Sequence, residues 1–510
     1  MGMKWRKWAL PVAPLALALL ASGCDSTSGA PAAEPTAAPT TSAARSVARV
    51  CAKPAAGPAK APAGAVRVDP AVVGDLAAKT KKSPPNTTFW LRPGKHRLDP
   101  DRYAQVIPKK GDRYLGAPGA VLDGRKKNQY AFGGSARDVT IRYLTVQRFV
   151  APHDEGVVNH DSADGWLIEH ATIQHNSAAG LMAGSGQRVR GSCLRANGQY
   201  GMNAYKAKGR LSDLVLEGNE IVGNNTGDWE RRRKGCGCTG GVKFWAVNRA
   251  DIRGNWVHDN RGTGLWADTN NNDFRIEENV LDDNDGAALI YETSYNAVIR
   301  KNTFRRNNWI EGSRYADRGD SFPFATLYFS ESGGEPRIKA RTDKIEIYRN
   351  VLENNWSGIT LWENADRFCN SPANTSSGDC TLLVKDTGRC ADPAISRAPL
   401  YADCRWKTQR VDIHGNRFVL DKSVVECTVK CDRMAVLANY GTYPDWSPYQ
   451  GERVAEAITG KQHNRWHDNT YIGPWKFVTH DPSRVLDFGQ WQGAPYLQDA
   501  GSTFRSPEGG

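Results

Sequence analysis

The chain has 510 residues, of which 50 are glycine, and its formal net charge is +12. Repeated Asn-Gly and Asn-Asn pairs accompany the glycines, a composition that is typical of a turn-rich β protein and excludes a mainly helical one. The basic charge favours anionic partners, namely acidic polysaccharide, wall polymers or lipid headgroups, although a basic surface can also serve solubility alone.

The first 24 residues have the pattern of a secretory signal. A basic start precedes an apolar stretch over residues 10–20 that is too short to span a membrane. The run that ends at Cys24, Leu-Ala-Ser-Gly-Cys, resembles the lipobox of bacterial lipoproteins, which implies a lipid anchor on Cys24. Plain cleavage and secretion is the alternative, because Ala21 stands where that family usually has Leu. We therefore expect an extracytoplasmic monomer that meets a membrane only through its anchor and does not bind nucleic acid.

Residues 25–65 consist mostly of Ala, Pro, Ser, Thr and Gly. Such a segment has too few large apolar residues to form a core, so we predict a disordered tether between the anchor and the body. The body begins near Val66.

A short repeat in the body decides the fold. Its clearest copies begin at Ile252, Ile276, Ile299, Ile347 and Ile413. An Asn follows three residues after each start. Apolar residues alternate within each copy, which indicates a strand, and one copy cannot bury its apolar side chains unless copies stack. An Asn at the same bend of each coil can tolerate left-handed backbone and bond to its counterpart in the next coil.

We therefore predict an all-β fold, a right-handed parallel β-helix over residues 66–440. Irregular stretches interrupt the repeat, and they predict loop insertions near 223–240, 308–323 and 364–408. Residues 441–510 lose the repeat and are expected to cap the end of the solenoid.

From about residue 85 onward the chain resembles a family of bacterial, largely actinobacterial, exported proteins with right-handed parallel β-helix repeats. The motifs that carry the resemblance are Gly240-Gly241-Val-Lys243-Phe-Trp245, Gly264-Leu-Trp-Ala-Asp268-Thr-Asn-Asn, Tyr291-Glu292-Thr-Ser-Tyr-Asn296 and Trp362-Glu363-Asn364-Ala-Asp366-Arg-Phe-Cys369. The resemblance implies the fold and export but no particular reaction. The wider pectate-lyase-like superfamily implies polysaccharide lyases, hydrolases and epimerases, and also proteins without catalytic activity.

A second strand follows the Asn-rich turn of each coil and opens on a small residue. Side chains alternate along a strand, so the second and fourth residues after that opener should face solvent. They are His160, Asn203, Tyr205, Lys243, Trp245, Trp266, Asp268, Glu292, Thr360 and Trp362. Aromatic faces beside polar groups suit the rings and hydroxyls of a polysaccharide, with His160, Asn203, Tyr205, Trp245, Trp266 and Trp362 as binding residues. The alternative is that loops cover the tryptophans, which then only pack.

Asp268 and Glu292 occupy equivalent places on adjacent coils, where Cα atoms lie about 5 Å apart. Two carboxylates so close can perturb each other and could act as acid and nucleophile in glycoside hydrolysis with retention. They could instead hold Ca²⁺, the one cofactor that the sequence suggests. Lys243 could serve as a base or pair with a uronate. The alternative is a structural carboxylate ladder screened by Lys243.

Pro152-His153-Asp154 resembles a motif of alginate C5-epimerases, which are also β-helices. The match covers three residues, and Ala151 stands where those enzymes have Asp. It implies an epimerase only as a minor alternative.

Eleven cysteines are present, and setting Cys24 aside leaves an even number, which favours disulfides in an exported protein. The plausible local pairs are Cys369 with Cys380, Cys390 with Cys404, and Cys427 with Cys431. The sequence cannot pair Cys51, Cys193, Cys236 and Cys238. The Cys236-Gly-Cys238 step is a weak zinc signal without a second ligand cluster.

Three functions stay open at this point. The first is a surface-anchored enzyme on polysaccharide, a lyase or hydrolase of an acidic glycan, with Lys243, Asp268 and Glu292 as catalytic residues. The second is a protein that binds glycan or cell wall without catalysis. The third is a purely structural solenoid.

Overall fold

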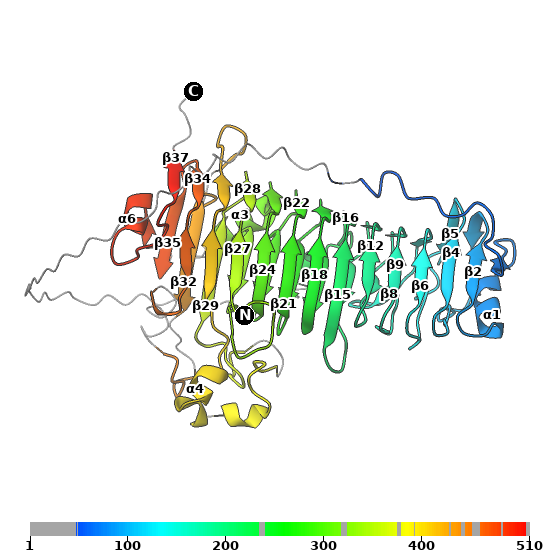
Figure 1. The fold of residues 1–510 in the computed structure, drawn as a ribbon, viewed down its shortest axis with the longest axis horizontal. Coiled ribbons are helices and arrows are strands. Elements are labelled where there is room, and N and C mark those ends of the chain that lie inside the picture. Colours follow the sequence, from blue (N-terminus) through cyan, green and yellow to red (C-terminus); the bar gives the residue numbers. More distant parts are fainter. Residues whose placement is uncertain are drawn as a thin grey trace, which may run out of the picture. The chain divides into compact units, whose positions relative to one another are not determined.

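The computed structural model describes residues 47, 49–233, 240–317, 324–374, 379–391, 393–427, 430–439, 444–450, 460–480 and 483–505. In these ranges the strands form three sheets, of 13, 13 and 11 strands, which we call the first, second and third sheet. From Thr140 to His480 each coil contributes one strand to each sheet in turn, so the chain winds repeatedly through the three sheets (Figure 1).

The first sheet holds the strands that open each coil. They are β1 (Val66–Val68), β2 (Thr88–Leu91), β4 (Arg113–Gly116), β6 (Thr140–Arg142), β9 (Leu167–Glu169), β12 (Arg188–Arg190), β15 (Leu211–Glu217), β18 (Val247–Arg253), β21 (Asn272–Glu277), β24 (Tyr295–Arg300), β27 (Ile345–Tyr348), β30 (Val411–His414) and β33 (Arg465–His467).

The second sheet holds the strands that follow the first bend. They are β3 (Gly94–His96), β5 (Ala120–Asp123), β7 (Thr145–Gln147), β10 (Thr172–Gln174), β13 (Cys193–Arg195), β16 (Glu220–Val222), β19 (Trp256–His258), β22 (Val280–Asp282), β25 (Thr303–Arg305), β28 (Val351–Glu353), β31 (Arg417–Val419), β34 (Thr470–Ile472) and β37 (Thr503–Arg505).

The third sheet completes each coil. Its strands are β8 (Gly156–Val158), β11 (Ala179–Met182), β14 (Tyr200–Ala204), β17 (Gly240–Trp245), β20 (Thr263–Asp268), β23 (Leu289–Glu292), β26 (Leu327–Ser330), β29 (Ile359–Asn364), β32 (Arg433–Asn439), β35 (Lys476–His480) and β36 (Val485–Leu486). The last pair, β35 and β36, is antiparallel.

The register confirms the predicted β-helix. Ile252 lies opposite Ile276, and the column continues through Ile299, Ile347 and Ile413. Each of these side chains is at most 1% exposed, so like residues stack in a continuous core. This burial of equivalent positions explains why a repeat that is weak in any one coil specifies the whole stack.

Asparagines form a ladder at the first bend, as predicted. Asn255 Nδ2 donates to Asn279 Oδ1 at 2.9 Å, and Asn279 Nδ2 donates to Asn302 Oδ1 at 3.0 Å. The left-handed backbone, which these asparagines were expected to tolerate, lies one residue earlier, at Gly254 (φ 61°) and Glu278 (φ 57°). The asparagines therefore act through their buried side chains, which satisfy the backbone at each bend.

Helices lie at the ends and in the insertions. They are α1 (Asp75–Lys82), α2 (Trp229–Arg232), α3 (Trp309–Asp317), α4 (Leu400–Asp403) and α6 (Phe488–Gln492), with 3₁₀ turns η1 (Thr387–Cys390) and η2 (Ala394–Ser396). Within the described part of the chain, no helix combines the length and the apolar character that crossing a membrane requires.

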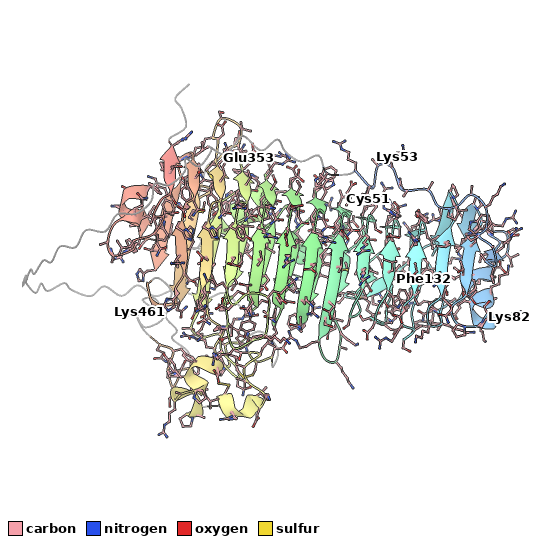
Figure 2. The ribbon with its side chains drawn as sticks, viewed as in Figure 1. Cys51, Lys53, Lys82, Phe132, Glu353 and Lys461 are labelled. Atoms are coloured by element: carbon pink, nitrogen blue, oxygen red, sulfur yellow. A yellow bond between two sulfur atoms is a disulfide. The ribbon has the colours of Figure 1, made fainter. Side chains whose placement is uncertain are left out.

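Two predicted boundaries differ from the structure. The solenoid does not end at residue 440, because β33, β34 and β35 complete a further coil before α6. The predicted tether is packed on the body from Arg49 onward, since Cys51 is bonded to Cys193 of β13 and Trp90 Nε1 donates to Pro58 O at 2.9 Å. Figure 2 labels Cys51 and Lys53 in this segment. The signal and residues 25–46 lie outside the described residues.

Candidate functional site

The outer face of the third sheet lies between the two groups of insertions. Residues 223–233 follow β16 of the second sheet and precede β17 of the third, and residues 306–317 lie likewise between β25 and β26, so both segments border one edge of the third sheet. The described residues between β29 and β30 border the opposite edge. Because loops on a rigid scaffold commonly shape binding sites, this face is the candidate site.

Two columns of side chains run along this face. In one column Lys243 lies opposite Trp266, and Trp266 lies opposite Ile290. In the other column Trp245 lies opposite Asp268. Lys243 therefore reaches Asp268 diagonally from the neighbouring column, because the residue directly opposite Asp268 is Trp245.

Lys243 and Asp268 form an ion pair on this face. Lys243 Nζ lies 2.9 Å from Asp268 Oδ2, and the two side chains are only 14% and 11% exposed. The ammonium also lies over the Trp266 ring, 4.4 Å from its centroid, an attractive cation–π geometry. Thr269 Oγ1 donates to the other carboxylate oxygen of Asp268 at 2.8 Å. The lysine is thus held in place by a carboxylate and an aromatic ring.

Glu292 belongs to a second ion pair beside the first. Arg367 Nη1 lies 2.6 Å from Glu292 Oε1, and Trp266 Nε1 donates to Glu292 Oε2 at 3.1 Å. The same Nη1 lies 3.3 Å from Glu331 Oε2. Trp266 therefore links the two pairs, since its ring contacts Lys243 and its N–H binds Glu292.

Glu331 is the most deeply buried acid of this cluster, with a side chain that is 1% exposed. Burial raises the pKa of Glu331 to about 7, even though Arg367 acts to lower it. The Asn364 N–H donates to Glu331 Oε1 at 2.9 Å. A group with this pKa can exchange a proton near neutral pH.

The acidic pair differs from the sequence hypothesis in its partners. Asp268 and Glu292 do lie on adjacent strands, but each is neutralised by its own cation rather than facing the other carboxylate alone. Among the described residues, no group of three or more His, Cys, Asp or Glu side chains suits a metal ion. A Ca²⁺ ion held by this pair would have to displace Lys243 and Arg367.

The tryptophans of the face are half-buried. Trp266 and Trp362 pack at the border of a small apolar cluster, which contains Ala287, Ile290, Phe324 and Tyr328 together with Tyr315 of α3. Trp362 also contacts Ala435 and Val478 of the following coils. The structure thus supports part of the packing alternative, because each ring has one covered region and one region toward solvent.

Two predicted binding residues, Asn203 and His160, and one further residue of the predicted outward row, Thr360, lie outside the open face. Asn203 is 5% exposed and donates to Asp154 O at 3.0 Å, and Thr360, its counterpart on β29, is fully buried. His160 lies beyond the end of β8, and its ring stacks on the Tyr130 ring with centroids 3.6 Å apart. The prediction for His160 was wrong because Gly156 pairs with Ala179, one residue away from the assumed Gly180. Tyr205, 40% exposed, follows β14 as expected.

The Pro152-His153-Asp154 run lies before β8, beside the loop that carries α2. His153 Nδ1 lies 2.7 Å from Asp154 Oδ2, and its ring lies 4.5 Å from the Trp229 ring. Its Nε2 is 3.2 Å from Gln199 Nε2. These contacts are separate from the pairs of Lys243 and Arg367.

Arg367 and Glu331 were missed by sequence reasoning. Arg367 lies in the insertion after β29, where no alternation applies, and Glu331 follows the last residue of β26 at a left-handed φ of 43°. The only available signal for Arg367 was its place in the Trp362–Cys369 motif.

Four disulfides lie within the described residues. Cys369 is bonded to Cys380, Cys390 to Cys404, and Cys427 to Cys431, the three local pairs that proximity suggested. The fourth joins Cys51 to Cys193 across a sequence separation of 142. Cys24 and the Cys236-Gly-Cys238 step fall outside the described residues.

Residues 156–326 match the family model of the right-handed β-helix region. No curated protein matches the chain. The A-module of the mannuronan C-5 epimerase AlgE4 from Azotobacter vinelandii is similar, with 12% identity, a TM-score of 0.42, and coverage of 70% of this chain and 94% of that one.

A second similar structure is the catalytic unit of a GH87 α-1,3-glucanase from Streptomyces thermodiastaticus. It has 14% identity and a TM-score of 0.34, and the match covers 59% of this chain and 66% of that one. At such identities both likenesses concern the fold alone, and one fold can carry many different functions.

Proposed function

We propose that the protein acts outside the cell on an extended acidic polysaccharide, which it binds along the outer face of the third sheet and cleaves at Asp268 and Glu292. The observation that supports this is the linked pair of ion pairs, Lys243 with Asp268 and Arg367 with Glu292, joined by Trp266. Two cations and two carboxylates beside an aromatic ring match the groups of a uronate-containing chain.

The direction of the stack suits a polymer. Neighbouring coils are about 4.8 Å apart, so a chain laid across the strands meets a new set of side chains at each coil. A uronate carboxylate can take the place of Asp268 at Lys243 or of Glu292 at Arg367. Substrate binding would then release a protein carboxylate next to the sugar, where it can accept or donate a proton.

The test is a screen of the purified chain against acidic and neutral polysaccharides. New reducing ends measure cleavage, and the ultraviolet absorbance of an unsaturated uronate separates a lyase from a hydrolase. Asp268→Asn and Glu292→Gln should each lower turnover by roughly 10²–10⁴-fold. Asp213→Asn is the matched control, because Asp213 forms an exposed ion pair with Arg249 on the first sheet. Turnover that is unchanged in both site variants contradicts the proposal.

A second candidate is binding without catalysis. It is favoured by the partial burial of both ion pairs, which gives the carboxylates a structural role in the absence of substrate. It predicts that acidic glycan binds with no new reducing ends, and that Trp266→Ala weakens binding whereas Asp268→Asn leaves it nearly unchanged.

Export and lipid anchoring are part of the proposal. The disulfides support an oxidising compartment. We expect the protein in the membrane fraction of its cells, and Cys24→Ser should move it to the soluble fraction or leave the leader uncleaved. An unchanged membrane fraction together with a cleaved leader in this variant would contradict the anchor at Cys24.

A further inference from the structure

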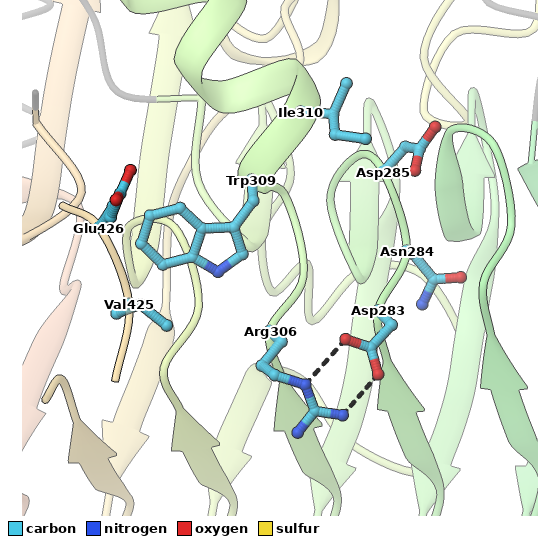
Figure 3. Close-up of a pocket in the computed structure, with 8 residues that line it drawn as sticks. All are labelled: Asp283, Asn284, Asp285, Arg306, Trp309, Ile310, Val425 and Glu426. Atoms are coloured by element: carbon cyan, nitrogen blue, oxygen red, sulfur yellow. Dashed lines mark hydrogen bonds and ion pairs between the residues drawn. The ribbon is translucent and has the colours of Figure 1, made fainter. Parts of the chain in front are cut away.

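A hollow of about 420 Å³ lies at the edge between the second and third sheets, away from the ion pairs of the proposed site (Figure 3). The turns after β22 and β25, the first turn of α3 and the loop after β31 form its walls. Its lining residues are Asp283, Asn284, Asp285, Arg306, Trp309, Ile310, Val425 and Glu426. The volume is within the range of small-ligand sites, about 300–1,000 Å³.

Asn354 anchors two walls of this hollow. Its backbone carbonyl accepts a bond from Trp309 Nε1 at 2.9 Å, which fixes the indole at the start of α3. Its side-chain oxygen accepts a bond from Asp421 N at 2.9 Å, which ties down the loop that leads to Val425 and Glu426. The Trp309 ring is therefore held in place without a ligand, and it faces the space between that loop and Arg306, as Figure 3 shows.

The polar lining is acidic. Arg306 is the one cation among the eight lining residues, and Asp283 already binds it, with Arg306 Nε 2.8 Å from Asp283 Oδ1. Asp285 and Glu426 add two further carboxylates. A ligand that carries a carboxylate would meet like charge here, whereas hydroxyl or ammonium groups would meet acceptors.

We propose that the hollow is a second glycan-binding site, which holds a sugar ring without a carboxylate against Trp309. The indole offers an apolar face, Ile310 and Val425 extend it, and the carboxylates accept bonds from ring hydroxyls. The proposal rests on the proposed function for its class of ligand, yet it assigns a different sugar chemistry to a different place. The cations of the third-sheet face suit uronates, and the acidic hollow suits neutral or amino sugars.

The test titrates the full chain with laminaripentaose, chitosan pentasaccharide and pentagalacturonate by calorimetry. We expect at least one of the first two to bind, and Trp309→Ala to weaken that binding roughly tenfold. Ile310→Arg, at a position that is 41% exposed, should block the hollow without opening a cavity in the core. Trp266→Ala is the matched control on the third-sheet face and should leave this binding unchanged.

The outcomes separate the two proposals. Binding of a carboxylate-free probe that is lost in both Trp309→Ala and Ile310→Arg supports the hollow, whatever happens to pentagalacturonate. Failure of both carboxylate-free probes, or binding that survives both variants, overturns it. Loss of pentagalacturonate binding in Trp266→Ala bears only on the third-sheet face. Thermal melts that match those of the unmodified chain show that each variant folds.

Discussion

Arg367 reaches back across the third sheet to Glu292, 75 residues earlier in the chain, and its Nη1 lies 2.6 Å from Glu292 Oε1. The same guanidinium contacts Glu331 of the intervening coil. The insertion after β29 therefore completes the charged cluster of the face. Without it, two carboxylates on neighbouring coils would lose the cation that they share.

Arg367→Gln should both destabilise the fold and abolish activity on acidic glycan. The substitution leaves the partly exposed Glu292 and the buried Glu331 without their cation, which costs roughly 2–4 kcal/mol of unfolding free energy. Urea unfolding measures this loss. Arg367→Lys keeps the charge and should recover part of the stability. Equal stability of the Gln variant and the unmodified chain would show that Glu331 and Glu292 do not depend on this cation.

Glu331 should make the protein less stable as pH rises. Its pKa is raised from 4.5 to about 7, mainly by burial, so between these values the folded chain holds a proton that the unfolded chain has lost. Stability is therefore highest below pH 4.5 for this group and falls as pH rises to about 7, by roughly 1–3 kcal/mol. Glu331→Gln should remove this slope in urea unfolding measured across the window.

Glu311 of α3 provides the comparison for this pH effect. Burial also raises its pKa to about 7, so it adds a slope of the same sign. Glu311→Gln should remove the part of the pH dependence of unfolding free energy that Glu311 contributes, and it should leave the part that Glu331 contributes. A pH profile unchanged by either substitution would contradict the buried protonated state.

Asn279→Ala should weaken the middle of the solenoid. Its Nδ2 donates to Ile252 O and Asn302 Oδ1, and its Oδ1 accepts from the backbone and side chain of Asn255. Removing the side chain leaves several buried groups without partners and should cost roughly 2–4 kcal/mol in urea unfolding. Arg275→Ala, on the neighbouring surface, is the control and should cost less than about 1 kcal/mol.

The disulfide between Cys51 and Cys193 should protect the N-terminal segment. The Cys51 N–H also donates to Glu220 Oε2 at 2.7 Å, so the bond and the hydrogen bond hold the segment on the second sheet. Cys51→Ser with Cys193→Ser should expose residues 49–65 to proteases and cost roughly 2–4 kcal/mol. The Cys427–Cys431 disulfide closes a far shorter loop, so replacing both of its cysteines with serine should cost less unfolding free energy. Equal proteolysis of the two double variants would contradict this role.

The sequence by itself determined the repeating coil of the solenoid and which of its side chains face the core. Alternation along each strand is a local property. Residue spacing alone therefore predicts the isoleucine column from Ile252 onward. It also predicts which side of the third sheet carries Lys243 and Trp266. The local disulfides follow from proximity in the chain. The one register error, at His160, arose because Gly156, the assumed opener of β8, pairs with Ala179 and not with Gly180.

Only the tertiary structure decided what the charged side chains meet. Lys243 pairs with Asp268 across two columns, Arg367 arrives from an insertion, and Cys51 crosses to a strand 142 residues away. Insertions carry no periodic pattern, because they do not stack on copies of themselves, and their place is set by docking on the finished solenoid. The hollow beside Trp309 has the same origin, since Asn354 joins a helix and a loop that no repeat relates.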